Sequence, residues 1–69
     1  MTNTTLDKPH VGDLVMDFRD DLGVISLIET DKEGTLYFVL WTSGDLTGYT
    51  TAHKLKDIEQ MLENVKQNT

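Results

Sequence analysis

Short hydrophobic runs, rich in β-branched and aromatic residues, alternate with turn-forming residues along most of the chain. This pattern is typical of an all-β domain with closely spaced strands. The predicted strands cover residues 13–18, 22–30, 35–42 and 45–51. Because the connections between them are short, we expect the four strands to form an antiparallel meander.

The residues between the runs predict how the strands connect. Asp20 and Asp21 have turn-forming side chains and separate the first two strands. Residues 31–34 have Asp at the first position and Gly at the fourth, as a type I turn prefers, and they predict a hairpin between two long strands. Residues 43–45 predict a second tight hairpin turn, in which Gly44 takes a positive φ.

Side chains of a strand alternate between its two faces, and this alternation assigns each residue to one face. In residues 35–41 one face has Tyr37, Val39 and Trp41, and the other has Leu36, Phe38 and Leu40. In residues 22–29 one face has Leu22, Val24, Ser26 and Ile28, and the other has Gly23, Ile25, Leu27 and Glu29. Both strands are therefore largely apolar on both faces. Such a strand is either covered on both sides, or one of its faces is a binding surface.

After residue 51 the hydrophobic period changes to that of an amphipathic helix. The apolar positions that recur at this spacing are Leu55, Ile58, Leu62 and Val65, with Met61 beside them. Asp57 followed by Gln60 resembles a capping box and predicts a helix over residues 58–67. Leu55 then falls in a short fifth strand or a 3₁₀ turn before the helix.

A helix of about ten residues is not stable alone, so its apolar stripe must be covered. One interpretation is that the stripe covers the open end of the chain's own β domain. The alternative is an isologous dimer, in which the stripe pairs with the same stripe of a second copy. In either case the contact residues are Ile58, Met61, Leu62 and Val65.

The order of motifs resembles the small Src-homology-3-like (SH3-like) barrels, in particular KOW-type and Tudor-like modules. The resemblance rests on the segments Gly12-Asp13-Leu14-Val15, Leu22-Gly23-Val24-Ile25, Tyr37-Phe38-Val39-Leu40-Trp41 and His53-Lys54-Leu55. Small phage-encoded proteins share this layout. The resemblance implies a mainly β fold: a five-stranded antiparallel barrel over residues 10–56, after a flexible tail of residues 1–9 and before a C-terminal helix and tail over residues 57–69.

The net charge changes what this resemblance implies about function. The 69 residues include twelve acidic and six basic ones, which gives a formal charge of −6. Residues 11–34 alone hold seven acidic and two basic residues, a net charge of −5. RNA-binding KOW modules are basic in this region, so nucleic-acid binding is disfavoured. The acidic residues form two clusters, at residues 17–21 and 31–34. These clusters are interpreted as a solvated surface, as a surface that attracts a basic partner, or as a mimic of duplex phosphates.

The chain offers little chemistry for catalysis or metal binding. It has no cysteine, which excludes disulfides and thiolate ligands, and His10 and His53 are far apart with no ligand pattern around them. The hydroxyl side chains have no base at a recognisable spacing. We therefore expect no enzyme activity, no cofactor and no metal. With no signal peptide or membrane span in the sequence, the expected location is the cytoplasm, the host cytoplasm or virion if the protein is phage-encoded.

The aromatic residues near the acidic turns are the candidate binding residues. The predicted partner-binding set is Phe18, Asp20, Asp21, Tyr37, Trp41, Asp45 and Tyr49. A partly exposed Trp41 and Tyr49 would form the centre of this face, which suits a basic or proline-containing segment. The predicted function is a non-enzymatic protein-interaction module, as monomer or homodimer. The alternatives are a virion structural or assembly component and a nucleic-acid-associated KOW-like module.

Overall fold

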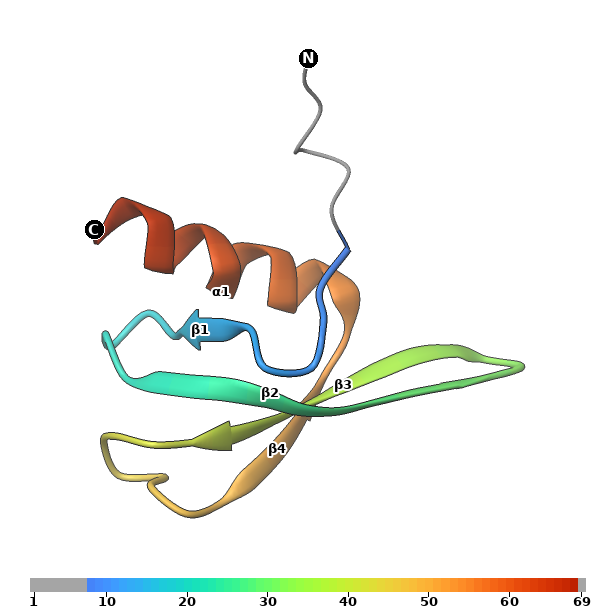
Figure 1. The fold of residues 1–69 in the computed structure, drawn as a ribbon, viewed down its shortest axis with the longest axis horizontal. Helices are drawn as coiled ribbons and strands as arrows, with labels where there is room; N and C mark the ends of the chain where they lie inside the picture. The colour runs from blue at the N-terminus through green and yellow to red at the C-terminus, as the bar shows by residue number, and fades with distance from the viewer. Residues whose placement is uncertain (1–7, 69) are drawn as a thin grey trace.

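The computed structural model describes residues 8–68, and its fold is a four-stranded antiparallel sheet followed by one helix (Figure 1). The elements are β1 (Leu14–Met16), β2 (Leu22–Asp31), β3 (Gly34–Trp41), β4 (Thr50–His53) and α1 (Leu55–Gln67). The strands lie in the sheet in their order along the chain. The predicted mainly β meander with a C-terminal helix is confirmed. Residues 1–7 of the predicted tail lie outside the described residues.

The predicted closure of the sheet into a five-stranded barrel is wrong. Over residues 8–68 there is no fifth strand, and the edge strands β1 and β4 do not pair with each other. Helix α1 packs on one face of the sheet, against β1 and β3, and so covers the apolar side chains that strand closure would enclose. A hydrogen bond from Asn64 Nδ2 to the Met16 carbonyl oxygen (2.9 Å) fixes the helix to β1.

The fourth strand lies further along the chain than predicted, because residues 42–49 form a compact loop instead of the predicted tight turn at residues 43–45. Gly44 and Gly48 both have positive φ, 83° and 88°. The loop is closed by hydrogen bonds from Gly48 N to Trp41 O (2.9 Å) and from Trp41 N to Tyr49 O (3.0 Å). Pairing with β3 starts only at Thr50, which faces Leu40.

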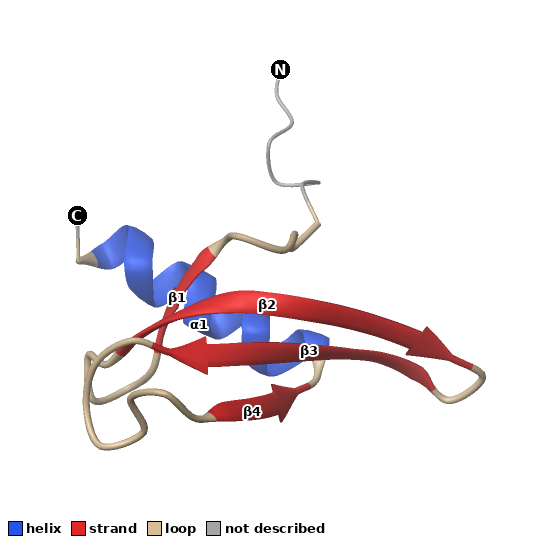
Figure 2. Cartoon of the chain, turned by 60° about the horizontal axis from the view of Figure 1, so that its bottom comes forward, coloured by secondary structure: helices blue, strands red, loops and turns tan. Residues whose placement is uncertain are grey.

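The hairpin between β2 and β3 is confirmed at the predicted position. Asp31 pairs with Gly34, and Asp31 Oδ1 accepts a hydrogen bond from the Glu33 N–H (2.8 Å). Gly34 has a φ of 130°, which side-chain-bearing residues rarely adopt. The end of this hairpin projects beyond the rest of the sheet (Figure 2).

A β-bulge at Ser26 changes the predicted faces of β2. Ile25 pairs with Val39, but Leu27 pairs with Phe38, so Ser26 has no partner of its own across the ladder. The extra residue reverses the alternation beyond it. The assignment of Ser26 and Ile28 to one face with Val24, and of Leu27 and Glu29 to the other with Ile25, therefore fails: Ile28 lies on the same face as Ile25, and Leu27 lies opposite.

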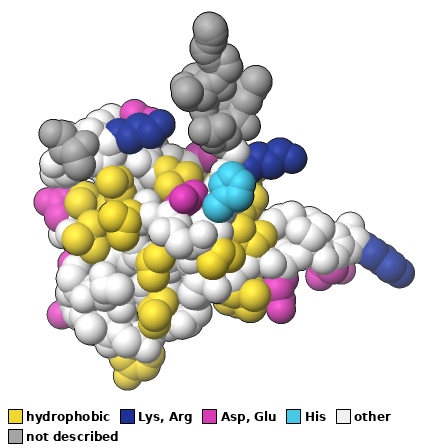
Figure 3. All heavy atoms as spheres, viewed as in Figure 1, with side chains coloured by type: hydrophobic (Ala, Val, Ile, Leu, Met, Phe, Trp, Pro, Cys, Tyr) yellow, Lys and Arg dark blue, Asp and Glu magenta, His cyan; other side chains and the backbone are white. Residues whose placement is uncertain are grey.

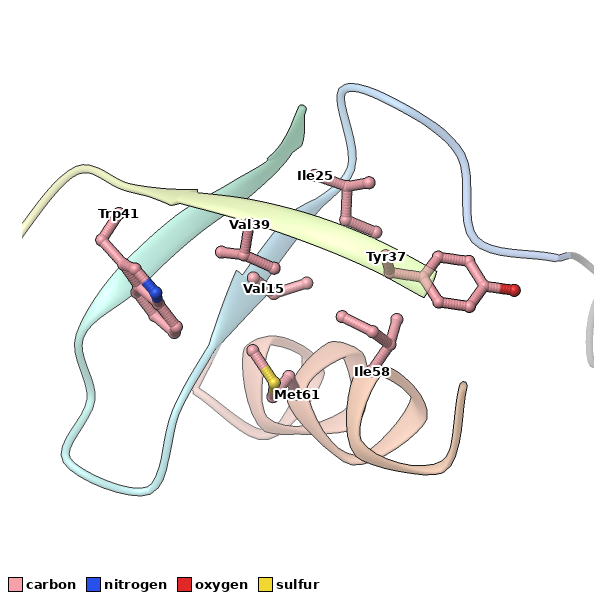
Figure 4. Close-up of a cluster of buried hydrophobic side chains, with 7 residues drawn as sticks. All are labelled: Val15, Ile25, Tyr37, Val39, Trp41, Ile58 and Met61. Carbon is pink, nitrogen blue, oxygen red and sulfur yellow. The ribbon is translucent and has the colours of Figure 1, made fainter. Parts of the chain in front are cut away.

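The core lies between α1 and the face of the sheet toward it, which we call the inner face (Figure 4). Its buried side chains are Val15, Ile25, Tyr37, Val39, Trp41, Ile58 and Met61. Of the predicted helix stripe, Ile58 and Met61 are buried, Leu62 packs against them, Val65 is half-buried and Leu55 is exposed. The stripe thus covers the chain's own sheet.

The start of the helix differs from the prediction. Leu55 is its first residue, and Lys54 is the N-cap without a side-chain capping bond. Asp57 therefore lies inside the first turn, and the predicted capping box with Gln60 is wrong. Gln60 Nε2 instead donates to Asn64 Oδ1 (3.0 Å), one turn further along the helix.

Candidate docking surface

Two loops far apart in the sequence meet at one end of the sheet, which we call the loop end: residues 17–21 and 42–49. The Leu22 N–H donates to Ser43 Oγ (2.8 Å), and the Leu22 carbonyl oxygen accepts from the Thr42 N–H (2.8 Å). Gly44 lies against the Asp21 carboxylate, where a Cβ would overlap it. The structure thus places predicted site residues from both loops, including Asp45, at the same end of the molecule.

The acidic turn at the loop end is organised around Asp17. Its Oδ1 accepts hydrogen bonds from the Arg19 N–H (2.8 Å) and the Asp21 N–H (3.0 Å). The Arg19 guanidinium lies 3.4 Å from Asp17 and 3.5 Å from Asp21, so one cation is shared between two carboxylates. Asp20, with a positive φ of 68°, is exposed. The turn is therefore closed by its own hydrogen bonds and ion pairs, and residues 17–21 remain net negative.

The predicted aromatic set is divided between the surface and the core. Phe18 and Tyr49 are 88% and 66% exposed, whereas Tyr37 and Trp41 are buried. Trp41 is only 3% exposed, so the predicted binding face centred on a partly exposed Trp41 and Tyr49 is wrong.

Trp41 is held in the core by a chain of polar contacts on the inner face. Its Nε1 donates to Thr51 Oγ1 (2.8 Å), and Thr51 Oγ1 lies 2.6 Å from His53 Nε2. Because an indole N–H only donates, Thr51 accepts from Trp41, and its own hydrogen can be directed at an unprotonated His53. Burial lowers the pKa of His53, against the opposing effect of Asp57. Burial thus disfavours the protonated ring of His53, which takes part in a packing contact of the inner face.

The opposite face of the sheet, which we call the outer face, is apolar and uncovered. In Figure 2, β2, β3 and β4 lie side by side in front of α1, and no other element lies in front of them. Cross-strand partners share a face, so the pairs Leu14–Val24, Val24–Leu40 and Leu27–Phe38 belong to it. The apolar residues along the middle of the outer face include Leu14, Val24, Leu27, Leu36, Phe38 and Leu40.

The leucines of the outer face are well exposed. Leu14, Leu27, Leu36 and Leu40 expose 56%, 47%, 38% and 36% of their surface. An antiparallel sheet with one solvated face usually has polar residues there. The sequence signal for this surface is the second apolar face of residues 35–41. The predicted site residues, which are aromatic and acidic residues near turns, do not include it.

The projecting end of the β2–β3 hairpin borders the outer face. A shallow hollow there is lined by Glu29, Asp31, Glu33, Gly34, Thr35, Leu36 and Lys54. Figure 3 shows acidic side chains along this hairpin and a cation at its end, with hydrophobic side chains over the body of the domain. Glu29 pairs with Leu36 in the ladder, so its carboxylate lies beside the apolar residues of the outer face.

The described part of the chain contains no group of three or more acidic or histidine side chains placed to hold a metal ion. Between residues 8 and 68, no helix has the combination of length and apolar composition needed to cross a membrane. Comparison of the chain with family models, curated proteins and solved structures gives no match.

Proposed function

We propose that the protein is a non-enzymatic docking module that binds a segment of another protein on the outer face of its sheet. The observation that carries this proposal is the uncovered apolar surface formed by Leu14, Val24, Leu27, Leu36, Phe38 and Leu40. Contiguous apolar patches on small proteins mark interaction sites, because exposing them to water has a free-energy cost that binding removes.

The location of the apolar residues supports docking over a purely structural role. The inner face already supplies the core, with α1 packed on it. The outer face therefore has no covering element of its own among residues 8–68. Phe18 and Tyr49, the exposed aromatics of the loop end, lie beyond the sheet and are available to extend the contact.

The test compares partner capture by matched variants in extracts of cells that make the protein naturally. Leu27→Gln and Leu40→Gln each remove an exposed leucine from the outer face, and Leu55→Gln removes one from α1, where Leu55 is 42% exposed. We expect the two outer-face variants to lose the specifically captured protein and Leu55→Gln to retain it. Circular dichroism checks that all three variants are folded. Unchanged capture by both outer-face variants would contradict the proposal.

A further inference from the structure

Both ends of the outer face are negatively charged. The loop end has four acidic residues and one basic residue, Asp17, Asp20, Asp21, Asp45 and Arg19, a net charge of −3. The hairpin end has three acidic and two basic residues, Glu29, Asp31, Glu33, Lys32 and Lys54, a net charge of −1. Between these ends the outer face has only apolar and uncharged polar side chains.

This charge pattern disfavours a second copy of the chain as the occupant. Two identical faces that pack on each other are related by a twofold axis. If that axis runs along the strands, the loop end of one copy meets the loop end of the other copy. If it runs across the strands, the loop end of one copy meets the hairpin end of the other. In both cases two negatively charged ends meet. Juxtaposed like charges oppose such a complex. Arg19 does not relieve this repulsion, because Asp17 and Asp21 already share its guanidinium.

We infer that the outer face binds a protein segment that is apolar in its centre and carries lysine or arginine at its ends; this inference rests on the proposed function. The apolar centre covers Leu27, Phe38 and Leu40, and the basic ends meet the two acidic ends of the face. At the hairpin end, the alkyl stem of a lysine or arginine packs on Leu36 while its charged group meets Glu29.

The length of β2 sets the spacing of the basic groups. Asp21, just before β2, and Glu29 are eight residues apart, but the bulge at Ser26 leaves seven steps along the ladder, which correspond to about 23 Å at ~3.3 Å per residue. The basic ends are therefore separated by about seven residues in an extended partner and by about fifteen residues in a helical one, where the rise is ~1.5 Å per residue.

The experiment uses two labelled peptides with the same leucine- and serine-containing centre and a dilysine or a diglutamate at each end. Each is made in an extended length and a helical length, and binding to the full chain is followed by fluorescence anisotropy. At low salt we expect the lysine-flanked peptide to bind at least about tenfold more tightly than the glutamate-flanked one. The preference should shrink at high salt, because salt screens exposed charges.

Two double variants, each of which removes two carboxylates, show which part of the surface causes the preference for the lysine-flanked peptide. Glu29→Gln combined with Asp31→Asn removes two carboxylates from the hairpin end, and the amide of the Asp31→Asn side chain keeps an oxygen that can accept from the Glu33 N–H. Glu59→Gln combined with Glu63→Gln removes two exposed carboxylates from α1. The first pair should lose several-fold affinity for the lysine-flanked peptide, and the second pair should lose little.

The outcomes separate this inference from the proposed function. If both peptides bind equally and Leu40→Gln weakens both, the charge preference is overturned while docking on the outer face stands. If neither peptide binds, the inference is overturned. If light scattering then shows a dimer that Leu40→Gln dissociates, a second copy is the occupant, and both proposals fail.

Discussion

The two faces of the same sheet have nearly the same composition but different surroundings. On β3, Tyr37, Val39 and Trp41 face α1 and are buried, while Leu36 and Leu40, which alternate with them, are over one-third exposed. Both sets are apolar, but α1 covers only the side with Tyr37, Val39 and Trp41. The comparison shows that hydrophobicity alone does not separate buried from exposed residues in a sheet this small; the position of the covering element does.

The contrast should appear first as a difference in stability. Ile25 is fully buried on the inner face, and Leu27, just beyond the bulge, is 47% exposed on the outer face. Ile25→Ala leaves a cavity and should cost about 2–5 kcal/mol of the free energy of unfolding. Leu27→Ala should cost under about 1 kcal/mol. Urea unfolding measures both; similar losses would show that the outer face is also covered.

If Ile25→Ala abolishes folding, the comparison is made with Ile25→Val. This smaller truncation should cost about 0.5–1.5 kcal/mol on the inner face. An unchanged free energy of unfolding in Ile25→Val would contradict the assignment of Ile25 to the core.

Substitution by a larger side chain should also affect the stability of the two faces differently. A Cβ at Gly23 would lie 2.6 Å from Val39 Cγ1 and 3.0 Å from Trp41 Cε3. Gly23→Ala should therefore cost about 1–3 kcal/mol through overpacking. Ala52→Val adds carbon to an exposed outer-face position opposite Phe38, and should change the stability by under about 0.5 kcal/mol. Thermal melts of both variants test this; an unaffected Gly23→Ala would show that the inner face has free space.

Adjacent threonines on β4 provide a third comparison. Thr51 accepts the hydrogen bond from Trp41 Nε1 on the inner face, whereas Thr50 faces Leu40 on the outer face. Thr51→Val leaves the buried indole N–H without this acceptor and should cost about 1–3 kcal/mol. Thr50→Val should be neutral, since it adds an apolar group to an apolar surface. The check is denaturant unfolding with tryptophan fluorescence, and equal effects would contradict the role of Thr51.

The sequence predicted the parts of the fold that depend on local chemistry. Strands β2 and β3 and the turn at residues 31–34 follow from alternation and from the positions of Asp and Gly. The helix follows from the spacing of Ile58, Met61 and Leu62. These features need only neighbouring residues, so they can be read without knowing the tertiary structure.

The errors arose where a distant contact decides the local structure. The bulge at Ser26 has no sequence signature of its own, because a serine fits an alternating strand equally well. The burial of Trp41 depends on where α1 docks and on the acceptor at Thr51. Barrel closure failed because α1, which begins at Leu55, covers the inner face without a fifth strand. The candidate site moved to the outer face for the same reason.

The smallest expected effect is a pH dependence of the free energy of unfolding, which arises from His53 on the inner face. Burial lowers the pKa of His53 below its ordinary value of 6.5. As the pH falls through 6.5, the unfolded chain takes up a proton at His53 before the folded chain does, so the free energy of unfolding decreases. Above this range His53 is neutral in both states and contributes no slope.

Denaturant unfolding measured from neutral pH to about one pH unit below 6.5 isolates this contribution. Compared with the unchanged chain measured in parallel, His53→Gln should flatten the decline in stability over that range. A decline that persists in full after His53→Gln would mean that another group carries the dependence. The pKa of His53 would then be the same in the folded and the unfolded chain, which contradicts the burial of this side chain on the inner face.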